Sequence, residues 1–362
     1  MFKVINHQHQ IKARTGAIST AHGVLHTPAF MPDATRGLVK LLSKDEVLAT
    51  GTKALVVNTF HLYLQPGMKI IKAAGGLHKF MNWDGPLLSD SGGFQVFSLI
   101  HKNPQMGKIT DDEVIFKSPL DGSRHVLTPE KSIQIQFDLG VDMMVCLDDC
   151  PPNDFSRIQL EQAVERTINW AKRAKIEYEK QCQKRKLTGK KKPLIFSVIQ
   201  GGAELDLRER CARGLVEIGF DGYGFGARPV DVQGKFLGQV LKFTANIIPA
   251  DKIRFALGVG TPEDIKRCQK MGWDLFDCVI PTREGRHGRL FFKSKKSKGY
   301  EAVNINNSKY RTNWQPINAQ SHLNLVKGHS RAYLHHLFKL GDPLASRIAS
   351  LNNLEFYQSL MK

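Results

Sequence analysis

The sequence predicts an α/β protein whose main body is a (β/α)8 TIM barrel. Eight short apolar runs recur in its first 280 residues, and helical patterns separate several of them. Polar residues repeatedly follow these runs, as they do where barrel strands end at an active-site rim. Continuous apolar runs are typical of parallel strands, because helices cover both faces of a parallel sheet. The alternative fold is an open doubly wound sheet, but no G-x-G-x-x-G follows an early run.

Each candidate strand is a short apolar run that ends in polar residues or glycine. The eight runs are Thr27–Pro32, Ala54–Asn58, Pro86–Asp90, Met143–Asp148, Leu194–Gln200, Tyr223–Ala227, Arg254–Val259 and Leu275–Ile280. Helices between them are predicted to begin at Thr128-Pro129 and Thr261-Pro262, where a threonine N-cap precedes proline at the first helical position. Three helices are predicted to end at a glycine that can adopt the left-handed cap, namely Gly140, Gly219 and Gly272.

The predicted organisation is a catalytic barrel at residues 1–289 and a small C-terminal α+β subdomain at residues 290–362. After Arg289 the strand–helix rhythm stops, and a helical pattern follows at Ser330–Lys339.

An insertion is predicted between the third and fourth strands, at about residues 91–142, because this stretch is too long for a simple crossover. It contains Val114–Lys117 and His125–Leu127 on either side of a turn at Asp121-Gly122. This pattern predicts an inserted antiparallel hairpin.

The chain is strongly basic, since 52 Lys and Arg against 34 Asp and Glu give a formal net charge of +18. Such an excess favours a polyanionic partner, because each neutralised phosphate releases counterions. No apolar run approaches the roughly 18 residues of a membrane helix, and the N-terminus has no apolar signal core. Six cysteines without a disulfide-rich spacing indicate reduced thiols, so we expect a cytoplasmic protein without membrane attachment.

Several polar residues lie at or near predicted strand ends, where the chemistry of (β/α)8 barrels takes place. Three are carboxylates, Asp90, Asp148 and Asp277, and Gln200 and the Gly226 loop follow two further strands. Two carboxylates suit exchange at an acetal-like carbon, because one can attack the sugar carbon while the other handles protons. A carboxylate such as Asp148 also suits guanine, whose N1–H and 2-amino group are two parallel donors.

The sequence gives little support for a metal or ATP site. Cys146 and Cys150 lie on one face of a predicted strand without chelating geometry, and no Cys-x-x-Cys occurs. The rings of the adjacent His335-His336 pair point about 100° apart on a predicted helix, which favours packing over ligation. No P-loop sequence occurs. We therefore expect no metal in the active site and no cofactor.

Six motifs, in order along the chain, resemble the tRNA-guanine transglycosylases. They are Asn58–Leu62 (NTFHL), Leu88–Gln95 (LSDSGGFQ), Ile199–Gly202 (IQGG), Gly219–Tyr223 (GFDGY), Leu275–Arg283 (LFDCVIPTR) and Ser330–Tyr333 (SRAY). The resemblance implies a (β/α)8 barrel with an inserted antiparallel element and a C-terminal subdomain. It also implies exchange of guanine at the anticodon wobble position of certain tRNAs for a 7-deazaguanine, on the route to queuosine.

The resemblance implies a role for each residue that matches a family motif. Asp277 matches the nucleophile that attacks ribose C1′ and holds the tRNA covalently, and Asp90 matches the general acid/base. Residues matching the base pocket are Ser91, Gly92, Phe94, Asp148, Cys150, Gln200, Ala227, Arg228 and Leu257. Residues matching the tRNA contacts are Asn58, Gln95, Arg283, Arg286 and Arg289. The implied partners are a tRNA with G at the wobble position, guanine or a 7-deazaguanine base, and a second copy of the chain.

The C-terminal subdomain departs from the family at its structural zinc site. Bacterial members bind zinc through Cys-x-Cys-x-x-Cys and a distant histidine. The matching positions here are Ser321, Leu323, Val326 and Asn352. Leucine and valine have no donor atom, so we expect a zinc-free subdomain held by packing. The family dimerises partly through surfaces near that site, so the oligomeric state is left open.

The loop after the sixth strand also departs from the family. Family members usually have Gly-Gly-Leu and a small residue, whereas this chain has Gly226-Ala227-Arg228-Pro229-Val230. Ala227 adds a Cβ, Arg228 brings a positive charge beside the base, and Pro229 removes a backbone donor. A guanidinium there disfavours a cationic base, so we expect an altered preference, toward a neutral or larger deazaguanine.

Two other functional readings compete with the transglycosylase. One is a non-catalytic tRNA-binding paralogue or partner subunit, which the zinc and loop departures favour. The other is base exchange on another nucleic acid, such as DNA. The presence of Asp90, Asp148, Gln200 and Asp277 favours the enzyme over the first alternative.

Overall fold

The computed structural model describes residues 1–7, 13–152, 154–294 and 299–362. Its centre is an eight-stranded parallel sheet with the strand order β4-β14-β13-β12-β11-β10-β6-β5. The strands are β4 (Ala29–Pro32), β5 (Leu55–Asn58), β6 (Leu87–Asp90), β10 (Met143–Val145), β11 (Leu194–Ile199), β12 (Gly222–Phe225), β13 (Ile253–Ala256) and β14 (Leu275–Cys278). A parallel bridge between Asp33 and Val56 joins the two outer strands into a barrel. All eight predicted strands and the barrel class are confirmed, and the doubly wound alternative is wrong.

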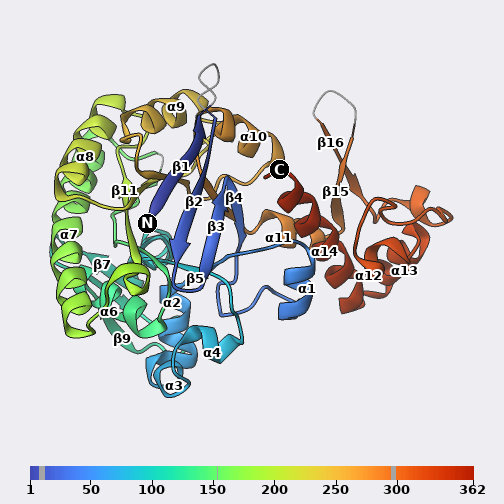
Figure 1. Ribbon diagram of the computed structural model, residues 1–362, viewed down its shortest axis with the longest axis horizontal. Coiled ribbons are helices and arrows are strands. Elements are labelled where there is room, and N and C mark those ends of the chain that lie inside the picture. The colour runs from blue at the N-terminus through green and yellow to red at the C-terminus, as the bar shows by residue number, and fades with distance from the viewer. Residues whose placement is uncertain (8–12, 153, 295–298) are drawn as a thin grey trace.

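Helices surround the barrel (Figure 1). They are α1 (Lys44–Ala49), α2 (Thr59–Leu62), α3 (Met68–Ala73), α4 (Leu77–Met81), α5 (Gly93–Lys102), α6 (Pro129–Leu139), α7 (Arg157–Lys184), α8 (Leu205–Ile218), α9 (Gly238–Ile247), α10 (Pro262–Lys270) and α11 (Ile280–Arg286). Thr128 and Thr261 cap α6 and α10 through their side chains, as predicted. Across the described ranges, no helix combines the length and apolar character that crossing a membrane requires.

The amino end of the barrel is closed by a three-stranded antiparallel sheet that sequence analysis did not predict. Its strands are β1 (Phe2–His7), β2 (Arg14–Thr20) and β3 (Gly23–Thr27). Ile18 and Leu25 of this sheet are buried in the same core cluster as the residues that fill the barrel interior. With this end closed, the barrel opens only at the carboxyl ends of its strands.

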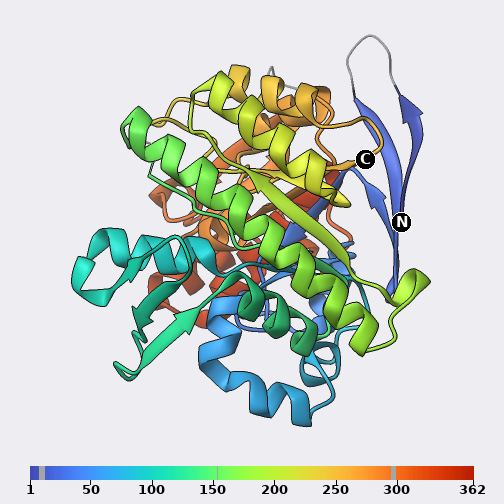
Figure 2. The ribbon, with the colours of Figure 1, turned by 90° about the vertical axis from the view of Figure 1, so that its left-hand side faces the viewer.

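The predicted insertion is an antiparallel sheet. Its strands are β7 (Gly107–Ile109), β8 (Val114–Lys117) and β9 (Arg124–Leu127), and β8 pairs with both neighbours. The predicted hairpin is confirmed, and β7 adds a third strand. Figure 2 shows this sheet projecting from one side of the barrel.

The C-terminal elements lie on the side of the barrel away from α7 and α8 (Figure 1). They are β15 (Arg289–Lys293), β16 (Tyr300–Asn304), α12 (Asn324–Lys327), α13 (Arg331–Leu340) and α14 (Pro343–Ser359). Gln358 of α14 donates to the backbone carbonyl of Phe30 in β4 at 3.1 Å, so α14 contacts the barrel directly. The division into two domains at residue 289 stays a prediction.

Candidate active site

A cavity of about 440 Å³ opens at the carboxyl ends of the barrel strands. Predicted site residues in its lining are Asp90, Ser91, Gly92, Phe94, Gln95, Asp148, Cys150, Gln200, Ala227, Arg228, Leu257 and Asp277. The structure thus brings together both predicted catalytic carboxylates and every residue predicted to contact the base. The predicted tRNA contacts Asn58, Arg283, Arg286 and Arg289 lie outside this lining.

The alternation of side chains along the strands explains why these residues meet. Leu88, Val198 and Leu275 fill the barrel interior. Side chains two residues apart on a strand point to the same side. Asp90, Gln200 and Asp277 lie two residues after these three positions and therefore form the next interior layer, at the mouth.

Three donors hold the Asp90 carboxylate. Oδ2 accepts a hydrogen bond from Asn58 Nδ2 at 2.6 Å, and Oδ1 accepts from the N–H groups of Thr59 and Gly92 at 3.2 and 3.1 Å. Gly92 is required here, because it has φ +78° and an added Cβ would lie 2.9 Å from the backbone N of Phe60. Burial raises the pKa of Asp90 to about 7 despite these donors. A carboxyl group with this pKa is suited to general acid/base catalysis near neutral pH.

Asp277 is the second predicted catalytic carboxylate in the cavity lining. Its Oδ1 accepts a hydrogen bond from the N–H of Gly258 at 3.0 Å. Burial raises the pKa of Asp277 to about 7. This carboxyl group is therefore about half ionised near neutral pH, and its ionised form can act as a nucleophile.

Asp148 and Gln200 form a hydrogen-bonded pair in the cavity. Gln200 Nε2 donates to Asp148 Oδ2 at 2.6 Å, and burial raises the pKa of Asp148 to about 7. Gly226 packs against the Gln200 amide, and an added Cβ would lie 2.5 Å from its carbonyl carbon. Gln200 Oε1 and Gln95 Oε1 are buried without a hydrogen-bond partner among the described residues. A polar ligand could supply the missing donors, because leaving buried polar atoms unpaired is unfavourable.

The neighbouring Asp149 has a different environment. Its carboxylate contacts Arg166 of α7, and its N–H donates to Thr167 Oγ1 at 3.1 Å. Asp149 is therefore held by the helical layer, whereas Asp148 lines the cavity.

The apolar part of the lining includes Phe94, Leu257 and Cys150. The Phe94 side chain is 47% exposed, which leaves its ring free to contact a ligand. Leu257 packs over Gly224 of β12, where an added Cβ would lie 2.3 Å from its Cδ1. Burial raises the pKa of Cys150 to about 12, so its thiol stays neutral. Together these residues suit the faces and edge of a planar base.

The loop after β12 places charge and strain beside the cavity. Ala227 has φ +76°, in the left-handed region that favours glycine. Arg228 is exposed and forms no salt bridge among residues that the structure describes. Its guanidinium is therefore not neutralised by a neighbouring carboxylate.

Arg208 of α8 is a site-supporting residue that sequence analysis did not identify. Its guanidinium is fully buried and donates to the carbonyls of Ile199 and Gly226 at 3.1 and 3.0 Å, and to Gly202 at 2.7 Å. Burial lowers its pKa to about 9. It fixes the two loops that present Gln200 and Gly226. An arginine within an amphipathic helix normally faces solvent, so no signal in the sequence distinguishes it.

Comparisons with known proteins show the family of this chain. Residues 9–362 match the family model described as "Queuine tRNA-ribosyltransferase". The chain belongs to this family. Relatives of that name include proteins from Caldanaerobacter subterraneus subsp. tengcongensis, 42% identical over 100% of this chain and 91% of the relative, and from Nitrosomonas eutropha, 42% identical over 98% and 93%. A third, from Pseudoalteromonas translucida, is 42% identical over 97% and 88%. The resemblance inferred from the motifs is confirmed.

In this member of the queuine tRNA-ribosyltransferase family, the predicted tRNA-contacting arginines lie just past β14, the strand that carries Asp277. Arg283 and Arg286 belong to α11, which begins two residues after β14. The Arg283 and Arg289 side chains are 50% and 56% exposed and lie on either side of Glu284, at 3.5 and 3.6 Å from its carboxylate. Asn58 donates to Asp90 and so orients that carboxylate directly.

The four positions that match the family's zinc ligands do not fit a metal ion. All four side chains are buried. Ser321 Oγ accepts from the N–H of Leu323 at 3.0 Å. Asn352 Nδ2 donates to the carbonyl of Phe291 at 3.0 Å. Val326 and Leu323 offer only hydrocarbon, so packing and amide hydrogen bonds occupy this region.

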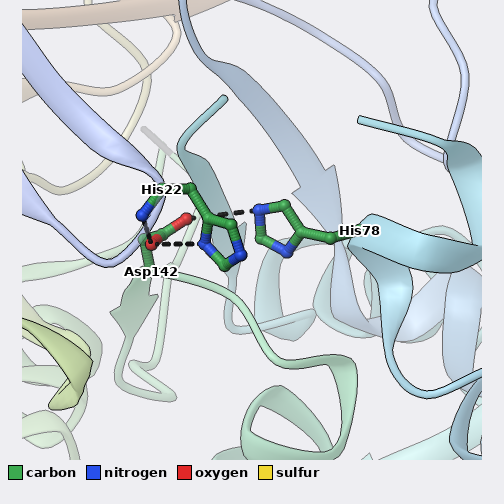
Figure 3. A group of neighbouring side chains, drawn as sticks. All are labelled: His22, His78 and Asp142. Carbon is green, nitrogen blue, oxygen red and sulfur yellow. Dashed lines mark hydrogen bonds and ion pairs between the residues drawn. The ribbon is translucent and has the colours of Figure 1, made fainter. Parts of the chain in front are cut away.

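One group of three potential metal ligands occurs in the described part of the chain, namely His22, His78 and Asp142. Asp142 precedes β10, so the group lies at the amino end of the barrel, opposite the cavity. The two imidazole rings stack 3.5 Å apart and only 14° from parallel (Figure 3). One ion cannot lie in the plane of both stacked rings, as the in-plane lone pairs of imidazole require. This arrangement suits a hydrogen-bonded clamp better than a metal site.

Proposed function

We propose that this chain exchanges guanine in the anticodon of tRNA for a 7-deazaguanine by double displacement. One observation carries the proposal: the carboxylates of Asp90 and Asp277 line the same cavity as the Asp148–Gln200 pair. Two carboxylates supply the nucleophile and the acid/base, and the pair supplies complementary groups for guanine. The family name, queuine tRNA-ribosyltransferase, supports the same reaction.

In the first step the ionised Asp277 attacks C1′ of the ribose. The bond between C1′ and the base nitrogen breaks, and the protonated Asp90 donates its proton to the departing guanine. The tRNA is then held as an ester between C1′ and an Asp277 oxygen. In the second step Asp90 takes the proton from the entering base, whose nitrogen attacks C1′ and releases the Asp277 carboxylate. No net proton is consumed.

The base is recognised at its polar edge and covered on its faces. The Asp148 carboxylate accepts from N1–H and the 2-amino group, and the Gln200 amide donates to the base carbonyl. Phe94 and Leu257 lie against the two faces. The exposed arginines of α11 and β15 contact the phosphates of the anticodon loop. The formal net charge of +18 attracts the tRNA as a whole.

The test is incorporation of radiolabelled guanine into a tRNA transcript with a G-U-N anticodon. Wild type is expected to incorporate label and to form a tRNA-linked band on a denaturing gel. Asp277→Asn is expected to lose at least about a thousandfold in rate and to form no band. Asp264→Asn is a matched control, because Asp264 lines the same cavity and has no role in the proposed reaction.

Three outcomes decide against the proposal. Tight tRNA binding without label would favour the non-catalytic partner. Equal incorporation into duplex DNA would favour exchange on another nucleic acid. Full activity of Asp277→Asn would remove the covalent intermediate from the mechanism.

A second proposal concerns the incoming base, and Arg228 motivates it. This guanidinium lines the cavity and has no carboxylate partner among the described residues. Like charges repel, so a base with a cationic side chain is disfavoured relative to a neutral or larger one. We expect Arg228→Leu to shift uptake toward 7-aminomethyl-7-deazaguanine. Unchanged relative uptake of that cationic base and of guanine, which carries no charged substituent, would contradict this assignment.

A further inference from the structure

Asp33 is a further carboxylate near the mouth of the barrel, and the proposed reaction does not yet use it. It directly follows β4, the strand that pairs with β14 of the nucleophile. Met31 fills the barrel interior, and Asp33 lies two residues further along the chain, on the same face of the strand. Its side chain therefore points to the interior side at the mouth, as Asp90 and Asp277 do on their strands.

The register places Asp33 between the two halves of the reaction centre. Met31 is the direct partner of Asp277 in the sheet, so Asp33 and Asp277 are diagonal neighbours, roughly 8 Å apart at their Cα atoms. On its other side Asp33 bridges to Val56, two residues before Asn58. Asn58 in turn donates to Asp90 at 2.6 Å.

Both negatively and positively charged side chains surround Asp33. The charge of Asp33 changes the pKa values of five neighbouring groups, namely Asp90 of β6, Asp277 and Cys278 of β14, Arg286 of α11 and His61 of α2. Arg36 also acts on His61. The negative charge of Asp33 adds to burial in raising the pKa of both Asp90 and Asp277. It opposes the lowering of the Arg286 pKa by burial.

The Asp33 side chain is held in place by its own loop. Its Oδ1 accepts from the N–H of Thr35 at 3.0 Å and from the Thr35 hydroxyl. Asparagine offers the same Oδ1 acceptor without the charge. The charge and the loop-fixing role of this residue can therefore be separated by substitution.

We propose that Asp33 is a positioning residue for the base exchange, a further carboxylate that acts through its charge on Asp277 on one side and, past Asn58, on Asp90 on the other. This inference rests on the proposed function. Carboxylates around one mouth do not all ionise readily, because each negative charge disfavours the next. Removing the Asp33 charge lets its neighbours release their protons at lower pH.

The first measurement is the pH profile of kcat/KM for guanine exchange. We expect Asp33→Asn to move the acidic limb to lower pH by about half to one pH unit. The plateau rate stays within about threefold of wild type. Asp33→Glu restores the charge and is expected to return the limb toward its original position. Thr35→Val is the matched control, since it removes the hydroxyl contact and leaves the charge.

The second measurement does not need activity. A carboxyl group whose pKa is raised by folding lowers the stability of the protein as pH rises from the unfolded to the folded pKa. The urea midpoint of wild type is therefore expected to fall between about pH 4 and pH 7, and to fall less in Asp33→Asn.

The two measurements separate the two proposals. Absence of exchange in wild type removes the proposed function, and the urea midpoints still decide the influence of Asp33 on its neighbours. Superposable pH profiles and equal midpoint changes would overturn the inference. So would a uniform loss of rate at every pH without a shift, because a purely structural role predicts that result.

Discussion

At the level of single residues, Ala227 has a backbone conformation that conflicts with its side chain. Its φ of +76° lies in the left-handed region, which costs a residue with a Cβ about 1–2 kcal/mol. The residue before it must be glycine, because a Cβ on Gly226 would overlap the Gln200 amide. The base-contacting loop therefore combines one obligatory glycine with one strained alanine.

Ala227→Gly is expected to raise the free energy of unfolding by about 0.5–1 kcal/mol, since relief of strain outweighs the added freedom of the unfolded chain. Urea unfolding measures the change. The control is Ala73→Gly at an exposed position in α3, which is expected to lower stability by up to about 1 kcal/mol. A less stable Ala227→Gly would show that the alanine conformation is unstrained.

The carboxylates of the site are expected to lower the free energy of unfolding at alkaline pH. The folded pKa of Asp277 is about 7 and its ordinary value is 3.8, so the folded chain holds a proton that the unfolded chain has released. Stability therefore falls as pH rises from about 4 to 7. Asp277→Asn is expected to be more stable than wild type at pH 8, on the order of 1–2 kcal/mol. The difference should vanish toward pH 4; an equal difference at both pH values would contradict the raised pKa.

At the level of elements, His22, His78 and Asp142 connect three segments at the amino end of the barrel (Figure 3). His22 follows β2, His78 belongs to α4, and Asp142 precedes β10. Asp142 also accepts from the N–H of Leu87 at 2.9 Å. Burial favours its neutral form, but hydrogen bonds from both histidines and Leu87 lower the pKa of Asp142 below its usual range.

Asp142→Ala is expected to lower the free energy of unfolding by about 2–4 kcal/mol, because it leaves buried donors unpaired. The lowered pKa means that this contribution is present above pH 4 and is lost as pH falls through the folded pKa. Thermal and urea unfolding at pH 7 measure the loss. Asp84→Ala removes an exposed ion pair with Lys44 and should lower stability far less. Equal effects of the two substitutions would show that the histidine clamp adds nothing.

Elements with a continuous apolar pattern were predictable from the sequence, whereas the alternating strands of the N-terminal sheet were missed. All eight barrel strands are buried on both sides and stand out as apolar runs. β2 alternates between buried and partly exposed residues, because its other face meets solvent, so no apolar run marks it. The strand-end polar residues of the cavity were predictable from the barrel rule. Arg208 and Asp33 were not, because their environments depend on contacts with distant segments.

At the level of the whole molecule, Asn353 and Asn352 join the C-terminal elements to the barrel. Asn353 Nδ2 donates to the carbonyls of Pro281 and Arg289 at 2.9 and 2.8 Å, and its Oδ1 accepts from the N–H of Phe291 at 3.0 Å. These bonds tie α14 to both α11 and β15. They offer a physical alternative to a metal ion for holding this region.

Chelation is therefore expected to leave the protein intact. We expect purified protein to contain less than about 0.1 zinc per chain and its melting temperature to stay unchanged in 1,10-phenanthroline, since a structural zinc normally contributes to folding. Elemental analysis and thermal unfolding measure both. Asn353→Ala is expected to lower the melting temperature instead. Stoichiometric zinc, or melting at lower temperature with chelator, would contradict the zinc-free proposal.

The closure of the barrel has a consequence for its biosynthesis. Arg14 and Asp274, which form a buried ion pair, are 260 positions apart, and β4 pairs with β14. At roughly 5–20 residues per second, a ribosome needs tens of seconds to proceed from one partner to the other. During that interval β4 lacks its partner strand β14, and the apolar side chains of Ile18 and Leu25 lack their core contacts with the later barrel strands. The nascent chain is therefore expected to bind chaperones until β14 emerges.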